Sequence, residues 1–426
     1  MPAPAKAATA ALLSILVLGA CSTPAASTAP SGTPAGSAPA SAAASARASA
    51  EPSTSGASAE PSTAASGDPI VIGFPADLSS TYAYYDQPML EGAEFAVDEI
   101  NAAGGVLGRP LQLEVVDIRN DPAETSKVTQ DLIDQGAVYL IGTTGDGISA
   151  EGALACAAGI PVSTGDGTAA TLVGDIGPCA FQLLMNDTIQ GAVAGDYALA
   201  QGYETVVIVG SPEIPYTQNL PGYFVEVFGQ GGGTVASEEQ YQIGAGDFSA
   251  VATKIANMDT EADVIYTPMF PPDTQVFMRQ LRQAGVTTPV ISSDGNLDPS
   301  LTSAGADALD GMVFTAAVCP ADTDPKVGEF YAAYNEANGA DPSSVVATLG
   351  YDEIRIVAQA IEAARSAEPA AIMEALADYE HAGVSGSSVM DPETRRAEKP
   401  AALIQMDGDT FTCLEQPGYP DFVPNP

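Results

Sequence analysis

Residues 70–118 read IVIGFPADLSSTYAYYDQPMLEGAEFAVDEINAAGGVLGRPLQLEVVDI. The run 70–74 is short and apolar, which is typical of a buried strand. Apolar side chains then recur at helical spacing over 88–103, with carboxylates on the rest of that surface. A second β-rich run follows at 111–118. The segment therefore predicts a β-α-β unit with two parallel strands.

The same alternation continues along the chain. Further runs expected as strands are 138–142, 160–164, 206–210, 235–240, 264–267, 289–293 and 312–318. Helical patterns that separate them include 122–135, 214–228, 248–258, 274–284 and 344–364. This order predicts an α/β fold with parallel sheets and helices on both faces. One sheet with so many strands would be unusually wide, so we expect two lobes.

The first 21 residues have the features of an export signal. Lys6 supplies a short positive region, and residues 10–18 form an apolar core too short to span a bilayer. The sequence Leu18-Gly19-Ala20-Cys21 resembles the lipobox of bacterial lipoproteins. We therefore expect 1–20 to be a lipoprotein signal peptide and Cys21 to carry the lipid. An ordinary secretory signal with a chance cysteine is the alternative.

Residues 21–67 begin with that cysteine and continue almost entirely in Ala, Ser, Pro, Thr and Gly. Such a composition cannot bury enough apolar surface to offset its ordering entropy, so we expect a disordered linker. As a coil it would span about 40 Å. The linker therefore predicts a tether between the membrane anchor and a folded body.

The formal net charge of the chain is −40. A body with this charge repels nucleic acid and anionic lipid surfaces, so neither is an expected partner. We expect contact with the membrane through the lipid anchor only.

Four cysteines remain once Cys21 is lipidated: Cys156, Cys179, Cys319 and Cys413. In a non-reducing compartment an even number predicts two disulfides. Three pairings are possible, and we favour Cys156–Cys179 with Cys319–Cys413. A metal site is the rival interpretation, but the sequence has no CxxC pair and its one histidine is His381. We therefore expect no metal.

Ligands of open parallel sheets bind beyond the carboxyl ends of the strands. Two such loops carry the same tetrapeptide TGDG, at 144–147 and 164–167. Asp146 and Asp166 are either N-caps of the following helices or ligand contacts, and the residues leave both open. Thr164 and Thr168 are candidate donors to a ligand.

Loops in the second half of the chain add two candidates. Phe270 lies in PMFPPD at 268–273 and is either an aromatic wall of a cleft or a core residue. Asp294 lies in a turn-forming DGN sequence, where its carboxylate either faces the cleft or caps the turn.

Four aromatic residues are also expected in loops, where their rings would cover a ligand: Tyr82, Tyr84, Tyr85 and Tyr216.

Residues 91–110 read EGAEFAVDEINAAGGVLGRP, and Asp117 and Asn120-Asp121-Pro122 follow them. This stretch resembles the leucine/isoleucine/valine-type (branched-chain amino acid family) substrate-binding proteins of ABC importers. The segments DFS at 247–249 and FMRQLRQAG at 277–285 are similar to the second-lobe pattern of that family. The resemblance covers 68 to about 415.

The resemblance implies a type I periplasmic-binding-protein fold. Two Rossmann-like lobes would be joined by three crossovers that act as a hinge, and closure would trap the ligand. Carried onto this chain, lobe 1 is expected at 68–188 plus 320–367, and lobe 2 at 189–319 plus 368–426.

The resemblance also implies roles for single residues. Tyr85 would cover the pocket from the first lobe, while Tyr216 and Phe270 would occupy aromatic positions of the second. Asp294 would pair with a ligand ammonium. The departure from the family is Asp146, which stands where a serine is expected to help hold the ligand carboxylate.

Two ligand hypotheses therefore stay open. If both loop aspartates are caps, the ligand is a branched-chain or other apolar amino acid. If they line the pocket, a carboxylate ligand would be repelled, and an amide, urea-like compound, polyamine or polyol is expected instead.

The expected role is that of a monomeric, extracytoplasmic solute-binding lipoprotein on the outer face of the cytoplasmic membrane. Its partners would be a small molecule and the permease and ATPase subunits of an ABC transporter; a ligand-sensing receptor is the alternative. We expect no enzyme and no cofactor, because one histidine leaves little material for a triad or metal centre. A pair of carboxylates acting as acid and base is the remaining catalytic possibility.

Overall fold

The computed structural model describes residues 65–426 except 144 and 146, and in this range the chain builds two large sheets and one small sheet. The first sheet has the strand order β2-β1-β3-β4-β5, and its pairs are parallel. Its strands are β1 (Ile70–Ala76), β2 (Leu111–Asp117), β3 (Tyr139–Leu140), β4 (Val162–Ser163) and β5 (Ala180–Phe181). The helices between them are α1 (Ala83–Ala102), α2 (Pro122–Asp134), α3 (Ile148–Ala158) and α4 (Leu172–Ile176).

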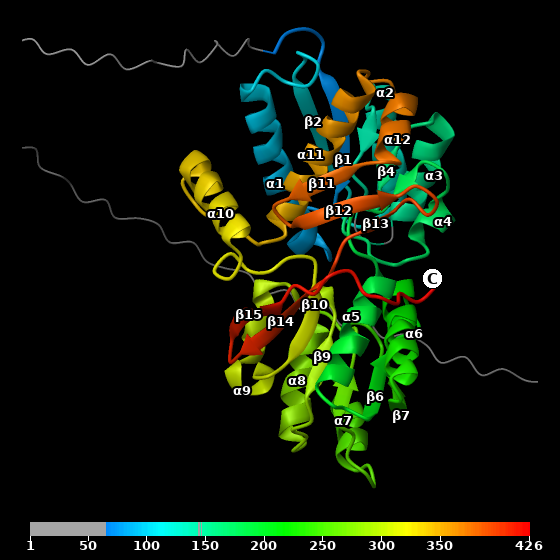
Figure 1. Cartoon of the computed structure of the whole chain (residues 1–426), viewed down its shortest axis with the longest axis vertical. Coiled ribbons are helices and arrows are strands. Elements are labelled where there is room, and N and C mark those ends of the chain that lie inside the picture. Colours follow the sequence, from blue (N-terminus) through cyan, green and yellow to red (C-terminus); the bar gives the residue numbers. More distant parts are fainter. Residues whose placement is uncertain (1–64, 144, 146) are drawn as a thin grey trace, which may run out of the picture. The chain divides into compact units, whose positions relative to one another are not determined.

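Helix α1 packs closely on α11 (Ala347–Ala364) over one face of this sheet (Figure 1). Glycines allow the approach: a Cβ on Gly92 would lie 1.7 Å from the Ala347 carbonyl oxygen, and one on Gly350 would lie 1.9 Å from the Met89 carbonyl oxygen. Side chains from α2 and α3, such as Leu132 and Ile148, pack in a separate core cluster with Leu140. Apolar residues therefore cover both faces of the first sheet.

The second sheet has the order β15-β14-β10-β9-β8-β6-β7. Five strands are parallel: β6 (Thr205–Gly210), β7 (Thr234–Gln240), β8 (Val264–Tyr266), β9 (Val290–Ser292) and β10 (Val313–Ala316). Two antiparallel strands complete its edge, namely β14 (Ala402–Asp407) and β15 (Thr410–Glu415). Its helices are α5 (Asp187–Ala200), α6 (Pro215–Gln230), α7 (Ser249–Ala256), α8 (Asp273–Gln283) and α9 (Ala306–Leu309), with 3-10 turns η1 (Asp294–Asn296) and η2 (Pro299–Ala304).

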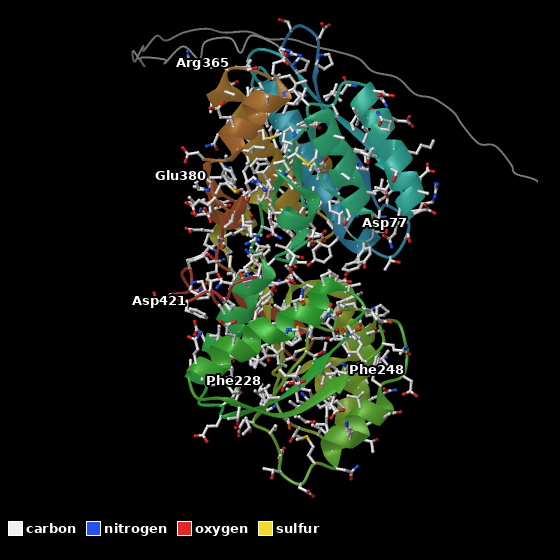
Figure 2. All side chains as sticks on the ribbon, turned by 90° about the vertical axis from the view of Figure 1, so that its right-hand side faces the viewer. Asp77, Phe228, Phe248, Arg365, Glu380 and Asp421 are labelled. Carbon is white, nitrogen blue, oxygen red and sulfur yellow. A yellow bond between two sulfur atoms is a disulfide. The ribbon has the colours of Figure 1, made fainter. Side chains whose placement is uncertain are left out.

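Alternate residues along β6 enter different core clusters of the second sheet. Val206 and Ile208 pack in the cluster that contains Phe228, whereas Val207 packs in the cluster that contains Phe248. Figure 2 labels one residue from each cluster, Phe228 and Phe248. The predicted α/β fold with two lobes is thus confirmed, each lobe being built around one of the two large sheets.

The small sheet consists of β11 (Glu380–Gly383), β12 (Gly386–Asp391) and β13 (Arg396–Glu398). It packs in the first lobe together with α12 (Pro369–Leu376), since Ile372, Leu376 and Met390 share the core cluster of β1. Two backbone hydrogen bonds also join Gln182 to the β13 region. Glu380 accordingly lies in the lobe that contains Asp77 (Figure 2).

This differs from the expected boundary, which placed 368–426 as one block in lobe 2. Residues 369–398 stay with the first core because their apolar side chains are buried there, and only β14 and β15 join the second sheet. Helix α10 (Pro325–Asn338) is the next element after β10. It contributes Phe330 to an aromatic cluster with Phe95 on α1.

Other local expectations need correction. Tyr84 and Tyr85 lie in the first turn of α1 rather than in a loop, because that helix begins at Ala83 and not at Pro88. Tyr216 lies in the first turn of α6. His381 lies on β11, where its side chain is 14% exposed and its Nε2 lies 3.6 Å from Asp352 Oδ1.

Two disulfides cross the fold in the favoured pairing. Cys156 at the end of α3 joins Cys179 just before β5, and Cys319 after β10 joins Cys413 in β15. Cys21, the expected signal peptide and the expected linker up to residue 64 lie outside the described residues. No helix of the described chain is long and apolar enough to cross a membrane.

Candidate ligand-binding site

A cavity of about 310 Å³ lies where loops of the first lobe meet loops of the second. From the first lobe it is lined by Tyr82, Tyr84, Tyr85, Thr143, Gly145, Ile148, Ser149, Asp166, Gly167, Thr168, Ala169 and Leu172. From the second lobe it is lined by Ile214, Pro215, Tyr216, Phe270, Asp294 and Gly295. These loops follow the carboxyl ends of strands, as expected for open parallel sheets. The volume is that of a small-molecule pocket.

Asp294 is the carboxylate that the second lobe presents to the cavity. It begins η1 directly after β9 and is 8% exposed. Tyr216 donates its hydroxyl to Asp294 Oδ1 at 2.9 Å, and Gln190 Nε2 donates to the same oxygen at 3.0 Å. Burial raises the pKa of Asp294 to about 6, although these hydrogen bonds favour the ionised form. The carboxylate is therefore buried, oriented and close to its titration point at neutral pH.

Tyr216 is positioned by the start of α6, where Pro215 occupies the first helical turn. Its single hydroxyl hydrogen goes to Asp294, so the same oxygen accepts from Ser293 Oγ at 2.5 Å and from the Gly295 N–H at 3.2 Å. Phe270 is tilted against the Tyr216 ring, with 6.3 Å between centroids. The second lobe therefore offers one carboxylate within an aromatic wall.

Buried polar groups fix the two first-lobe loops that follow β3 and β4 by hydrogen bonds. Ser163 Oγ accepts the N–H groups of Gly142 at 2.9 Å and Gly165 at 3.1 Å. Those glycines touch, since a Cβ on Gly165 would lie 2.0 Å from the Gly142 carbonyl oxygen. Glu353 on α11 bonds Ser163 and accepts the Tyr139 hydroxyl at 2.9 Å. Burial raises the pKa of Glu353 to about 7.

Asp166 lines the cavity and is half-buried. The helix that follows it begins at Leu172 with Thr171 as N-cap, so Asp166 does not cap it. Burial raises the pKa of Tyr84 well above its usual range, and the charges of Asp166, Asp298 and Asp294 raise it further. The neighbouring ring of Tyr85 packs edge-on against Tyr84, with 5.1 Å between centroids.

Eight of the sequence-predicted residues thus line one cavity: Tyr82, Tyr84, Tyr85, Asp166, Thr168, Tyr216, Phe270 and Asp294. Thr164 does not line it, because its side chain is fully buried and its hydroxyl donates to the Gly167 carbonyl at 2.9 Å. The Thr168 hydroxyl bonds the Asp187 carboxyl. Asp146 lies outside the described residues.

Sequence reasoning missed the apolar part of the lining, formed by Ile148, Leu172, Ile214 and Pro215, and also Ser149. Each of these residues lies in or next to the first turn of a helix that follows a candidate loop. Extending each candidate loop by one helical turn would have found them.

The sequence model of the periplasmic binding protein family matches residues 69–410. The chain belongs to this family. The Leu/Ile/Val-binding protein BraC3 of Rhizobium johnstonii is 28% identical over 72% of this chain and 83% of its own length. The resemblance to the leucine/isoleucine/valine-type members is thereby confirmed.

Two solved structures share the fold. A leucine binding protein of Thermotoga maritima superposes with a TM-score of 0.74 at 24% identity, covering 83% of this chain and all of that one. A branched-chain amino acid transporter substrate-binding protein of Streptococcus pneumoniae, solved with isoleucine, gives 0.71 at 26% identity and covers 81% and 98%. Both are named as binding proteins, and both share the fold of this chain.

Proposed function

We propose that this protein is an extracytoplasmic solute-binding lipoprotein that captures an apolar α-amino acid, branched-chain ones foremost, and delivers it to an ABC permease. The observation that supports this is Asp294, a buried carboxylate held by Tyr216 and Gln190 at the edge of a largely apolar cavity. A carboxylate so placed suits a ligand ammonium, because the low dielectric of the site strengthens the charge pair.

The rest of an amino acid has complementary surroundings. Apolar side chains of Ile148, Leu172, Ile214 and Phe270 line the cavity and suit an aliphatic side chain. On the first lobe, Thr143 and the glycine-rich loops offer hydroxyl and N–H groups for the ligand carboxylate. No lysine, arginine or histidine lines the described part of the cavity, so these neutral donors would have to bind the carboxylate.

Capture requires that the ligand favour the closed state. Both lobes contribute to the cavity, so a ligand there contacts both at once. The lipid on Cys21 and the linker to residue 67 would keep the lobes beside the membrane, where the permease and its ATPase receive the ligand. Binding by a monomer needs no catalytic group, and we propose none.

The test is calorimetric titration of the mature protein, unfolded and refolded to remove retained ligand, with leucine, isoleucine, valine and phenylalanine. We expect saturable binding with a dissociation constant of about 1 μM, a free energy near −8 kcal/mol. Asp294→Asn should weaken it by about 2–5 kcal/mol, because a buried ammonium would lose its charge partner. Asp310→Asn, an exposed aspartate of the second lobe, is the control and should bind as the wild type does.

A second candidate ligand is favoured by one observation: two carboxylates, Asp166 and Asp294, line the same cavity. A carboxylate-free amide, urea-like compound or polyamine would suit two carboxylates better than an amino acid does. The panel therefore includes leucinamide, urea, putrescine and spermidine.

Asp166→Asn separates the two ligand classes by the sign of its effect. For an amino acid the variant should bind more tightly, because a repulsive charge near the ligand carboxylate is removed. For a polyamine it should bind more weakly, because an attractive charge is lost. Binding confined to carboxylate-free compounds would overturn the amino-acid assignment.

A further inference from the structure

Gln190 on α5 connects two buried carboxyl groups behind the cavity. Its side-chain nitrogen donates to Asp187 Oδ1 at 3.2 Å and to Asp294 Oδ1 at 3.0 Å. Its side-chain oxygen accepts the Thr315 hydroxyl at 2.6 Å and the Asp294 N–H at 3.2 Å. Because carboxylates need donors and an N–H needs an acceptor, this network assigns the nitrogen and oxygen ends of the amide.

Asp294 is therefore held twice by one residue, through its main chain and through its side chain. Tyr216 adds a third hydrogen bond from α6. A group fixed in this way loses little conformational freedom when it binds a partner. The orientation of Asp294 thus depends on Gln190 even though Gln190 does not line the cavity.

The two carboxyls differ in their surroundings. Asp187 is fully buried; Thr168 and Gln190 donate to its carboxyl, but its Oδ2 has no hydrogen-bond partner among the described residues. Asp294 instead borders the cavity. Burial raises the pKa of Asp187 well above its usual range and the charge of Asp294 raises it further, whereas the pKa of Asp294 rises to about 6. Two like charges this close are costly, so one negative charge suits the pair.

We propose that Gln190 is a positioning residue of the ammonium site, which directs the single negative charge of the pair to Asp294 and leaves Asp187 neutral. The inference rests on the proposed function and specifies how that site is organised. Gln190 also connects the site to the segments that join the two lobes. Asp187 starts α5, just after the chain leaves the first sheet at β5, and Thr315 lies near the end of β10, just before the chain leaves the second sheet.

Five tyrosines from several elements face the pair: Tyr84, Tyr85, Tyr216, Tyr223 and Tyr266. Burial raises the pKa of each of them, so they stay neutral near pH 7. The charged groups that face these tyrosines in turn are the carboxylates of Asp166 and Asp298 and the guanidinium of Arg396, which acts on Tyr223. The charge that disfavours a second negative charge on Asp187 is that of Asp294.

The test is a carbon-13 NMR titration of the aspartate carboxyls in the ligand-free mature protein, with Asp187→Asn and Asp294→Asn used to assign the two signals. We expect the Asp294 signal to titrate near pH 6 and the Asp187 signal at a higher pH. The reverse order would overturn the proposal. This readout needs no ligand, so it decides which carboxyl of the pair carries the negative charge even if no amino acid binds.

Gln190→Met removes the amide while keeping the volume of the side chain. It should raise the Asp294 midpoint, because a donor to the ionised carboxylate is lost. Gln275→Met is the matched control, since Gln275 is also a buried glutamine of the second lobe and bonds Ser300 away from the cavity. It should leave the midpoint unchanged. Equal midpoints in Gln190→Met and the wild type would contradict the proposal.

Leucine titrations across pH 5–8 supply the functional readout. Wild-type affinity should fall as the pH drops through about 6, and Gln190→Met should bind about tenfold more weakly or worse at pH 7. If Gln190→Met does not fold, the wild-type titrations still test the charge distribution that the proposal requires, and the reverse order overturns it. If the wild type binds no member of the amino-acid panel, the proposed function fails. The carboxyl titration still tests the charge distribution between Asp187 and Asp294, because it needs no ligand.

Discussion

The Tyr85 hydroxyl donates a hydrogen bond of 2.8 Å to the main-chain carbonyl of Asp294, across 209 positions of sequence. Tyr85 lies in the first turn of α1 in the first lobe, and Asp294 follows β9 in the second. The bond therefore joins the lobes at the residue proposed to receive the ligand ammonium. A contact of this kind would form on closure and break on opening.

Tyr85→Phe should weaken binding of the ligand found by the titration panel by about 1 kcal/mol, because the closed state loses one buried hydrogen bond. The measurement is calorimetry at pH 7. Tyr379→Phe is the control: its hydroxyl bonds Ser388 at 2.7 Å in the small-sheet region, so stability should fall without a change in affinity. The same affinity loss in both variants would contradict the role of Tyr85 in closure.

Ser163→Ala should loosen both first-lobe loops, because Gly142 and Gly165 would lose the acceptor of their N–H groups. We expect a stability loss of about 1–3 kcal/mol and faster hydrogen exchange at these two amides. Ser292→Ala removes a buried serine of the second lobe that donates to Thr267 O at 2.6 Å. That control should lower stability without changing exchange at the two glycines.

The protein should be more stable at pH 5 than at pH 7.5. Burial raises the pKa of Glu353 from 4.5 in the unfolded chain to about 7 in the folded one. Between those values the folded state binds more protons, so the free energy of unfolding decreases as the pH rises. Glu353 alone should contribute roughly 2 kcal/mol to this difference, and Asp294, with a pKa near 6, acts in the same direction.

Urea unfolding at the two pH values measures this effect. Glu353→Gln should remove most of the contribution from that residue, because an amide does not titrate. Glu362→Gln on the exposed face of the same helix is the matched control and should retain the wild-type pH dependence. A Glu353→Gln profile parallel to that of the wild type would show that this carboxyl is not responsible.

The two disulfides should protect their four cysteines from alkylation in the folded, unreduced protein. Replacing both Cys319 and Cys413 with serine should lower the free energy of unfolding by about 4–5 kcal/mol, because this disulfide closes a loop of 94 positions. The same replacement of Cys156 and Cys179 should lower it by about 3 kcal/mol, because that loop spans 23 positions. Intact-mass analysis and urea unfolding supply the measurements. Labelling of any of the four thiols without reduction would contradict the pairing.

The sequence predicted most of the parallel strands, because most of them are apolar runs between turns. The expected strand 206–210, for example, corresponds to β6 at Thr205–Gly210. The two-residue strand β5 at Ala180–Phe181 was not predicted. Strands β11 to β13 were missed because residues such as Glu380, His381 and Ser387 give them little apolar character, and only tertiary contact buries one side. The expected lobe boundary, which came from the family resemblance, did not account for these three strands.

The rule of strand-following loops placed Asp166 and Asp294 correctly around one cavity, and the family resemblance added Tyr85, while the ligand roles of all three stay predictions. It could not find Gln190, because a glutamine within a helix carries no pattern that distinguishes a buried connector from a surface residue. Its partners Asp187, Asp294 and Thr315 come together only in the folded chain.

The order of the strands also constrains how the protein is assembled during synthesis. Strands β1 to β5 of the first sheet are made early, but α11 and the small sheet that cover its core come from residues 347–398. The second sheet likewise gains β14 and β15 only from residues 402–415. Neither core can close while the last fifth of the chain is missing, so a partly synthesised chain keeps apolar surface open to chaperones until almost the end.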